Sequence, residues 1–475
     1  MHFATVIDRT LRAPIHRQVY ETWREAILTG RFRAGERVPS TRELADSLGV
    51  SRGTISQAWD QLIAEGYLET VQGSGTFVCR ELPDRFVVTR RSNRRGVADD
   101  VPIKLSSYGS RLTEDWRRVS ATGVVIRFSP GVPDWNSFPF LLWRRLVGRH
   151  LRRLSPAVFN YVERSVGDER LRSEIAGYVT RLRAVCCSPE QVIVVNGSQQ
   201  GLDLCARLLI EPGDEVAFED PGYQGARRVF AAHGGRLIPL PLDTNGLVLN
   251  ALPRKARLVY VTPSHQYPTG VSMSLARRLG LIEWAKGCGA VIIEDDYCSE
   301  YRYSGPPLPS LQGLARGVAV IYLGTFSKVM FPGLRVGYIV SPPSLVAFFK
   351  RAKWLADTQT PMLEQAALAD FLGEGHMERH IRRMRRLYGM RRAALLSSLR
   401  RHFGDRAQVL GDAAGMHAMV RFHDVDIVGQ ASRNKVELVN ADSYYLTQPP
   451  GNEFVFGFSG LPERSIREGI RRLSP

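Results

Sequence analysis

The spacing of hydrophobic residues changes along this chain and divides it into two parts. Up to about residue 80, apolar residues recur every three or four positions, as in residues 14–30, which begin at Pro14 and end at Gly30. Such spacing places apolar side chains on one face of a helix, and proline and glycine are common at helix starts and ends. We therefore predict an amphipathic helix with a stripe made of Ile15, Val19, Trp23 and Ile27.

Two further helices and a hairpin are predicted before residue 80. Ser40 and Glu43 have the spacing of a capping box, and Ser51 is placed to cap the next helix. Residues 67–71 and 76–78 flank a glycine-containing turn, a pattern typical of a two-stranded wing. This order indicates a winged helix-turn-helix that reads DNA in the major groove. A helical protein-interaction module with the same core is the alternative.

Beyond residue 125, short apolar runs alternate with helical patterns. Runs of this length that alternate with helices are typical of buried strands, so we predict an α/β fold with a mostly parallel sheet. The predicted helices cover 202–209 and 275–286. The predicted strands cover 191–195, 215–218, 258–261, 290–293 and 318–323.

Polar residues gather where the predicted strands end, which is the edge where such sheets bind ligands. Residues 196–200 leave one strand and open a helix, whose free N–H groups and dipole would seat a phosphate. Tyr223 presents an aromatic ring after the second strand, and Asp295 and Asp296 end another. Neighbouring residues of a strand face opposite ways, so only one of these two carboxylates would meet a ligand.

Lys328 and Arg335 follow the last predicted strand. A neutral lysine amine forms a Schiff base with an aldehyde, and burial beside cations favours the neutral form. Arginine provides a forked donor for phosphate. A phosphate seat, a stacking ring, a carboxylate, a lysine and an arginine together describe a pyridoxal 5′-phosphate pocket.

Composition indicates a polyanionic partner and argues against a membrane protein, a secreted protein and a zinc protein. The chain has 475 residues, more than one ordinary domain, and a net charge of +17, which attracts nucleic acid. No apolar run of 18 residues and no signal peptide pattern occur, so we expect no membrane partner and a cytoplasmic location. The six cysteines lack C-x-x-C spacing, which predicts a reduced chain without a metal site. We interpret one arginine-rich run as a solvated helix face: Arg382, Arg383, Arg385, Arg386, Arg391 and Arg392.

Several of these segments carry a family resemblance. The N-terminal part resembles the winged helix of the GntR superfamily, and the part from about residue 131 onward resembles the fold-type I aminotransferases. Their fusion in this order resembles the MocR/GabR subfamily of GntR regulators, over nearly the whole chain. The matching segments are 38–45, 48–54, 64–68 and 73–78, then 262–270, 293–297, 324–328 and 331–338.

The GntR resemblance implies which residues meet DNA. Arg42 and Arg52 would contact phosphates or guanine edges, and Thr54 would lie near the DNA backbone. Gly73 would let the wing approach the minor groove, and Ser40 belongs to the same DNA-binding set. Double-stranded operator DNA is the implied partner.

The aminotransferase resemblance implies the cofactor residues. Lys328 would form the Schiff base with pyridoxal 5′-phosphate, Asp295 would pair with the pyridinium nitrogen, and Tyr297 would hydrogen-bond the phenolic oxygen. Tyr223 would stack on the ring. The phosphate would be held by Ser198, Gln199, Thr325 and Arg335.

The chain departs from that family at one position. MocR relatives carry an arginine near the C-terminus that binds a substrate carboxylate, and Val455 stands in its place. A lost charge-assisted hydrogen bond costs about 1.5–3 kcal/mol, so a standard α-amino acid is disfavoured as the ligand. Arg227 or Arg228 would be alternative carboxylate partners.

These patterns together predict a transcriptional regulator that depends on pyridoxal phosphate. Residues 1–80 would be the DNA-binding domain, 81–120 a linker, and 121–475 an aminotransferase-like domain that senses an amine, an amino compound or a B6 vitamer. The resemblance also implies a homodimer. A catalytically active aminotransferase with secondary DNA binding is the alternative.

Overall fold

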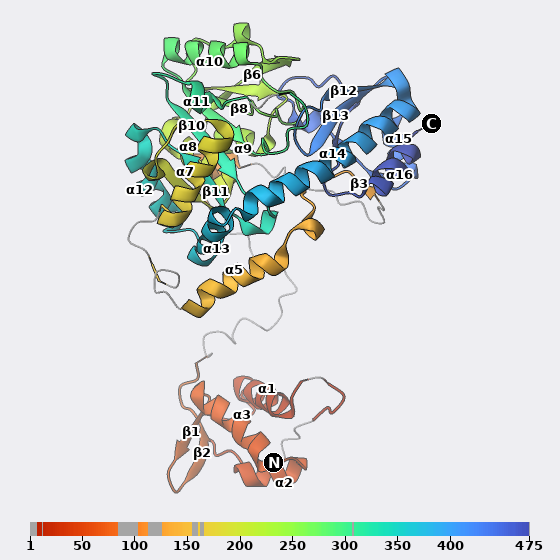
Figure 1. The fold of residues 1–475 in the computed structure, drawn as a ribbon. Helices are drawn as coiled ribbons and strands as arrows, with labels where there is room; N and C mark the ends of the chain where they lie inside the picture. Colours follow the sequence, from red (N-terminus) through yellow and green to blue (C-terminus); the bar gives the residue numbers. More distant parts are fainter. Residues whose placement is uncertain are drawn as a thin grey trace. The chain divides into compact units, whose positions relative to one another are not determined.

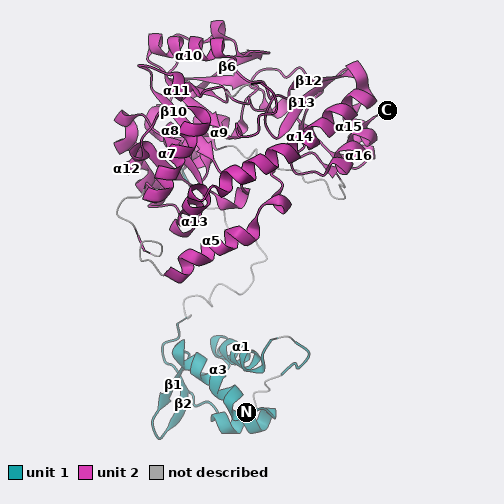
Figure 2. Ribbon diagram, in the orientation of Figure 1, with its two compact units in different colours: residues 1–104 teal, residues 105–475 magenta. Residues whose placement is uncertain are grey.

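The computed structural model describes residues 7–11, 13–83, 103–112, 126–153, 160–161, 166–305 and 308–474. The chain forms two compact units, unit 1 (1–104) and unit 2 (105–475), coloured separately in Figure 2. Most of the predicted linker, 81–120, lies outside the described residues, so the predicted domain boundaries stay predictions. No described helix has an apolar stretch long enough to cross a bilayer.

Unit 1 is a helix, a helix-turn-helix and a hairpin, as the sequence predicts. Its elements are α1 (Ile15–Leu28), α2 (Thr41–Leu48), α3 (Arg52–Ala64), β1 (Leu68–Val71) and β2 (Gly75–Val78). The capping box at α2 is present: the Glu43 amide donates to Ser40 Oγ at 3.2 Å, and Glu43 Oε2 accepts from the Ser40 amide at 2.8 Å. Trp23 and Trp59 lie edge to face at 4.9 Å in the core, so α1 and α3 are held together by buried aromatic rings.

Unit 2 is built on an eight-stranded sheet with the order β4-β11-β10-β9-β8-β5-β6-β7. The pairs from β10 through β9, β8 and β5 to β6 are parallel, which confirms the predicted, mostly parallel α/β fold. The strands are β4 (Val192–Val195), β5 (Glu215–Asp220), β6 (Arg236–Asp243), β7 (Gly246–Leu247), β8 (Leu258–Val261), β9 (Val291–Asp296), β10 (Val320–Thr325) and β11 (Gly337–Val340).

Helices cover both faces of this sheet (Figure 1). Alternate residues of each strand point to opposite layers. Ile293 packs in the core cluster that contains α8 (Ser198–Leu209) and α9 (Gln224–Ala232), whereas Ile292 packs in the cluster that contains α10 (Leu275–Cys288). Neighbouring residues of β9 therefore pack against different helices, on what we call the α8 face and the α10 face of the sheet. The helices around the sheet are α4 (Ser107–Arg111), α5 (Phe140–Arg153), α7 (Glu169–Arg183), α8 (Ser198–Leu209), α9 (Gln224–Ala232), α10 (Leu275–Cys288), α11 (Leu311–Leu314), α12 (Val346–Asp357) and α13 (Met362–Gly373).

A smaller sheet with its own helices completes unit 2. The long helix α14 (His376–Phe403) leads from the large sheet to the small one (Figure 1). At its end, the ring of Phe403 lies 5.0 Å from that of Phe422. The small sheet has the order β12-β13-β16-β15, and β14 pairs with β3. The remaining elements are β3 (Ile126–Arg127), β12 (Ala407–Gly411), β13 (His417–Phe422), α15 (Ile427–Arg433), β14 (Val436–Glu437), β15 (Val439–Asn440), β16 (Glu453–Gly457) and α16 (Glu463–Leu473).

The arginine-rich run in α14 only partly matches the predicted solvated face. Arg382, Arg383, Arg385 and Arg386 are exposed. Arg391 is buried and its Nη2 donates to Asp134 at 2.7 Å. The helical period exposes the first four arginines but points Arg391 into the interior, where a carboxylate compensates its charge.

Candidate functional site

A cavity of about 160 Å³ opens at the carboxyl ends of β8, β9 and β10, on the α8 face of the sheet. The sequence predicts eight cofactor residues, and all of them line this cavity: Ser198, Gln199, Tyr223, Asp295, Tyr297, Thr325, Lys328 and Arg335. Residues separated by up to 137 positions are thus brought together by the parallel sheet, because its strands end at one edge.

Lys328 lies three residues beyond the end of β10. Its Nζ donates to the Gly131 carbonyl at 2.9 Å, so the amine is held at the cavity wall by a neutral partner. Gly131 has φ +70°, and a Cβ there would come 2.8 Å from Nζ. The absence of a side chain at residue 131 therefore makes room for the lysine head group.

Asp295 and Asp296 diverge as the alternation of β9 requires. The Tyr260 hydroxyl donates to Asp295 Oδ2 at 2.7 Å, and Asp295 Oδ1 is buried without a hydrogen-bond partner among the described residues. Burial raises the pKa of Asp295 to about 6, against the opposing effect of the Tyr260 hydrogen bond. Asp296 instead pairs with Arg183 at 2.7 Å on the other face. Asp295 is therefore the carboxylate that faces this cavity.

The predicted phosphate seat is the first turn of α8, which begins at Ser198 after Gly197. The first N–H groups of a helix lack acceptors within it and carry the positive end of its dipole. Arg335 lies over this turn, with Nη2 donating to the Asn196 carbonyl at 3.0 Å. A Cβ on Gly197, whose φ is +81°, would approach that Nη2 to 2.7 Å. Glycine is thus needed here both for the backbone angle and for the arginine.

The aromatic wall comes from Tyr223, Tyr297 and Tyr267. The Tyr223 hydroxyl donates to Gln199 Oε1 at 3.4 Å, and Gln199 Nε2 donates to the Gly225 carbonyl at 3.1 Å. Tyr267 lies nearly perpendicular to both other rings, with centroids 5.7 Å from Tyr223 and 5.8 Å from Tyr297. The tyrosines therefore hold one another and leave flat ring faces available to a planar ligand.

Six further lining residues were missed in the sequence analysis: Pro130, Gly131, Tyr260, Thr262, Tyr267 and Ser327. Tyr260 sits in an apolar strand and has the appearance of a core residue, yet its hydroxyl reaches Asp295. The sequence feature that could have identified it is a hydroxyl at a buried strand position, because a buried hydroxyl requires a hydrogen-bond partner. Thr262 and Tyr267 lie in a segment whose sequence carried the resemblance, but no role was assigned to either.

Val455 is fully buried in the middle of the small sheet and is not among the cavity-lining residues. It packs in a cluster with Met419, Ala441 and Tyr444. Tyr267, a cavity wall residue, packs against the same cluster. The valine thus supports the cavity wall through apolar packing where an arginine would bring a charge.

In unit 1, the predicted DNA-binding residues occupy the helix-turn-helix and the wing. Arg42 and Arg52 are exposed at the starts of α2 and α3, and Arg52 Nε donates to Thr41 Oγ1 at 3.4 Å. Ser40 caps α2, and the Thr54 hydroxyl is 2.8 Å from Ser51 Oγ, so both hydroxyls have local partners. The turn of the wing places Gly73 in the open, with φ +78°. The helix starts therefore present exposed guanidinium groups, and the wing tip presents exposed backbone.

Comparison with known proteins assigns both units to families. Residues 15–78 match the model of the gntR family of bacterial regulatory proteins, and residues 138–467 match that of class I and II aminotransferases. The chain is 40% identical to the probable rhizopine catabolism regulatory protein MocR of Rhizobium meliloti, over 98% of this chain and 94% of that protein. It is 33% identical to the pyridoxine biosynthesis transcriptional regulator PdxR of Corynebacterium glutamicum, over 96% and 94%.

A solved structure supports the same assignment for unit 2. The α-aminoadipate aminotransferase LysN of Thermus thermophilus, complexed with N-(5′-phosphopyridoxyl)-L-leucine, superposes with a TM-score of 0.68 and 30% identity. The match covers 78% of this chain and 94% of that enzyme. Unit 2 therefore has the fold of class I and II aminotransferases, joined here to a gntR-type winged helix.

Proposed function

The chain belongs to the MocR-type regulators of the GntR family, and we propose that unit 1 binds operator DNA under the control of a pyridoxal 5′-phosphate pocket in unit 2. The observation that carries this proposal is the single cavity in which Lys328, Asp295 and Arg335 meet beside the first turn of α8. A lysine, a carboxylate and a phosphate seat in one cavity are the groups that this cofactor requires.

Unsatisfied polar atoms in the cavity support the fit of the cofactor. Asp295 Oδ1, the Tyr297 hydroxyl and Ser327 Oγ are buried with no nitrogen or oxygen partner among the described residues. Buried polar atoms without partners are costly, and a ligand with a ring nitrogen, a phenolic oxygen and a phosphate would supply such partners. Asp295 would hold the ring nitrogen, Tyr297 the phenolic oxygen, and Arg335, Thr325 and the start of α8 the phosphate.

The cofactor, when bound, supplies an aldehyde that a neutral amine can attack. Lys328 is the amine in reach, because its Nζ is at the cavity wall. The Gly131 carbonyl orients this amine through its hydrogen bond, and attack on the aldehyde requires the neutral amine. Lys328 would thus hold the cofactor covalently, and the other wall residues would orient it.

Transcriptional control requires that the two units be coupled. A ligand or the cofactor itself must bind one conformation of the protein better than another, since equal affinity shifts no equilibrium. The effector would be an amine, an amino compound or a B6 vitamer that enters the cavity beside Lys328. The apolar packing of Val455 disfavours a ligand whose carboxylate would need an arginine there.

A second candidate function is transamination, with DNA binding as an additional property. The observation in its favour is that the lysine, the aspartate and the phosphate seat needed for turnover are all in place. Conversion of an amino donor to a keto acid by the purified protein would support this function, and its absence with cofactor loaded would favour a sensor.

We propose that the functional unit is a homodimer. Two helices of unit 2 expose large apolar side chains: Leu141 is 75% exposed in α5, and Trp354 and Leu355 are 56% and 76% exposed in α12. Large exposed apolar side chains are typical of surfaces that a partner covers. Light scattering of the wild type and of a Leu141→Glu, Leu355→Glu variant tests this, since the variant should be monomeric.

The regulatory proposal is tested by titrating DNA from the protein's own upstream region with and without pyridoxal 5′-phosphate. We expect salt-dependent binding whose affinity or footprint changes when the cofactor is added. Identical binding curves and footprints in both conditions, for protein shown to hold the cofactor, would contradict coupling.

A further inference from the structure

A second, larger cavity lies on the other face of the sheet, behind the cofactor site. Its volume is about 450 Å³, and it lies among α7, α14 and the segment that follows β9. Five arginines line it, with one acidic residue: Arg181, Arg183, Arg278, Arg302, Arg385 and Glu300. None of these residues has a part in the proposed cofactor chemistry.

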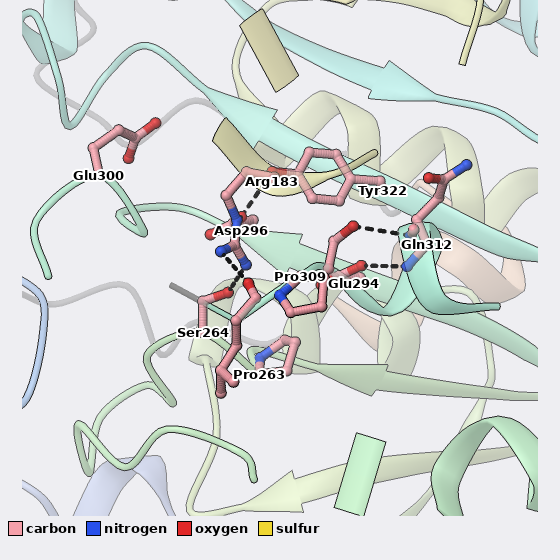
Figure 3. Close-up of polar contacts among 12 residues, drawn as sticks. Arg183, Pro263, Ser264, Glu294, Asp296, Glu300, Pro309, Gln312 and Tyr322 are labelled. Atoms are coloured by element: carbon pink, nitrogen blue, oxygen red, sulfur yellow. Dashed lines mark hydrogen bonds and ion pairs between the residues drawn. The ribbon is translucent and has the colours of Figure 1, made fainter. Parts of the chain in front are cut away.

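Two of the arginines, Arg183 and Arg278, form a floor whose guanidinium nitrogens already have protein partners, and Figure 3 shows the contacts of Arg183. Arg183 pairs with Asp296, donates to the Leu308 carbonyl at 2.7 Å and also bonds Ser264. Arg278 is fully buried, donates to three backbone carbonyls and lies 3.8 Å from Glu294. Each floor arginine therefore has a nearby carboxylate, and the floor is close to neutral.

Of the three remaining arginines, one is paired with a carboxylate and two are not, among the described residues. Arg181 is paired with Glu378 at 3.1 Å. Arg302 bonds only the Gly305 carbonyl at 3.3 Å and Ser272 Oγ at 3.4 Å, and Arg385 bonds only the Glu300 carbonyl at 2.9 Å, within the part of the chain that the structure describes. Neither has a carboxylate partner there. Two guanidinium groups thus keep donors for a ligand.

Glu300 is the one acidic group of the cavity wall. Its Oε1 accepts from the Tyr178 hydroxyl at 2.8 Å, while its Oε2 is buried and has no partner among the described residues. Burial raises the pKa of Glu300 to about 7. A buried carboxylate oxygen without a donor is costly, so a ligand that brings an ammonium or hydroxyl group would stabilise it.

From these contacts we infer that the cavity behind the sheet is a second binding site, for a small anion that carries a carboxylate or phosphate group next to an ammonium or hydroxyl group. Arg302 and Arg385 would take the anionic group, and Glu300 would accept the neighbouring donor. Arginine suits either anion, because its planar fork offers paired donors.

The position of the cavity suggests how occupancy would reach the cofactor. Arg183 contacts Asp296 of β9 and Ser264. Asp296 directly follows Asp295, and Ser264 lies between Thr262 and Tyr267, so both contacts adjoin residues that line the cofactor cavity. Arg183 lines the same cavity as Arg302 and Arg385, so a ligand that displaces Arg183 would act on both walls of the cofactor cavity. This regulatory meaning, unlike the binding site itself, rests on the proposed function.

Calorimetric titration of the full chain, loaded with cofactor, tests the site with glutarate, inorganic phosphate and L-glutamate. Glutarate and phosphate contain no amine, so they cannot react with an aldehyde. We expect glutarate, phosphate or both to bind. Tighter binding of phosphate than of glutarate would indicate that the natural ligand carries a phosphate group. In an Arg302→Gln, Arg385→Gln variant, affinity should fall at least about tenfold, since charged hydrogen bonds are lost. Arg386→Gln, the exposed neighbour that does not line the cavity, should bind as the wild type does.

A change at Glu300 separates this site from a merely basic surface. Glu300→Gln should tighten glutarate severalfold, because a repelling charge is removed, and should reduce the preference for L-glutamate over glutarate. The site is excluded if no probe binds the wild type at ~10 mM, a level that detects weak millimolar affinity. It is equally excluded if the double variant binds within twofold of the wild type. Cofactor absorbance, recorded in the same samples, reports separately on the proposed function of the front cavity.

Discussion

Asp295 and Asp296 are consecutive residues of β9 whose carboxylates serve opposite faces of the sheet. Asp295 accepts from Tyr260 at 2.7 Å at the cofactor cavity, while Asp296 holds Arg183 at 2.7 Å behind it. One strand end thus links the cofactor cavity to the cavity behind the sheet. The same alternation that gives the sheet two packed layers gives these two carboxylates different partners.

The two aspartates should respond differently to the same substitution. Asp296→Asn leaves Arg183 buried without its counter-charge, which should lower the free energy of unfolding by about 3–5 kcal/mol. Asp295→Asn should not destabilise the cofactor-free protein, because burial already disfavours its charge. It should instead weaken cofactor binding about tenfold or more, through loss of a charged hydrogen bond. Urea unfolding and cofactor titration measure both effects, and equal destabilisation by the two changes would contradict the assignment.

Cofactor uptake should depend on pH through Asp295. Burial raises the pKa of this carboxyl to about 6 in the folded protein, above the value of about 3.9 in an unfolded chain. The folded state therefore binds more protons between these values, and this group's contribution to stability is present below pH 4 and lost as pH rises through about 6. Cofactor binding needs the ionised form, so affinity should fall as pH drops below about 6. Asp295→Asn should abolish this pH dependence, which spectrophotometric titrations from pH 5 to pH 8 would reveal.

The phosphate seat should be sensitive to a single methyl group. Gly197→Ala would strain a backbone with φ +81° and place a Cβ 2.7 Å from Arg335 Nη2, so the phosphate-binding guanidinium must move. We expect cofactor affinity to fall by about tenfold or more. Gly213→Ala is the matched control, because its φ of +98° imposes similar strain while nothing lies within 4 Å of its Cβ. Similar affinity losses in both variants would mean that backbone strain alone is responsible.

Operator binding should depend on Arg52 without involving the cofactor. Arg52 is exposed at the start of α3, the helix whose N-terminal end is expected to enter the major groove. Arg52→Ala should weaken DNA binding, and if the arginine contacts phosphate, the salt slope should fall by about one. The cofactor absorbance band should be unchanged. Arg17→Ala on α1, where Arg17 pairs with Glu21, serves as the control. Retention of full operator affinity by Arg52→Ala would remove α3 as the recognition helix.

The central strands of unit 2 could be predicted from sequence because burial on both faces makes them continuous apolar runs. β8 matches its predicted range, and β9 and β10 extend two or three residues further, into the polar residues of the site. β6 was missed because Pro239 and Pro241 interrupt its pattern, and it contains exposed positions near the sheet's edge. Local patterns thus identify the buried middle of a sheet better than its edge.

The cofactor cavity was largely predictable, while the second cavity was not. Lys328, Asp295 and Arg335 each follow a recognisable strand, so topology alone brings them together. Arg183 and Arg278 lie in helices, where arginine is usually a surface residue. Their burial depends on Asp296, Glu294 and backbone carbonyls supplied by distant segments. The local spacing of residues does not predict such partners.

The most direct test of the account is reductive trapping of the cofactor on Lys328. The purified protein is incubated with pyridoxal 5′-phosphate, reduced with borohydride, digested and analysed by peptide mass spectrometry, with Lys328→Ala treated in parallel. We predict a stoichiometric phosphopyridoxyl adduct on the peptide that contains Lys328 and no other stoichiometric adduct. The Lys328→Ala variant should carry no such adduct. An unmodified Lys328 peptide, or equal labelling of lysines elsewhere such as Lys286, would contradict the claim that this cavity holds the cofactor covalently.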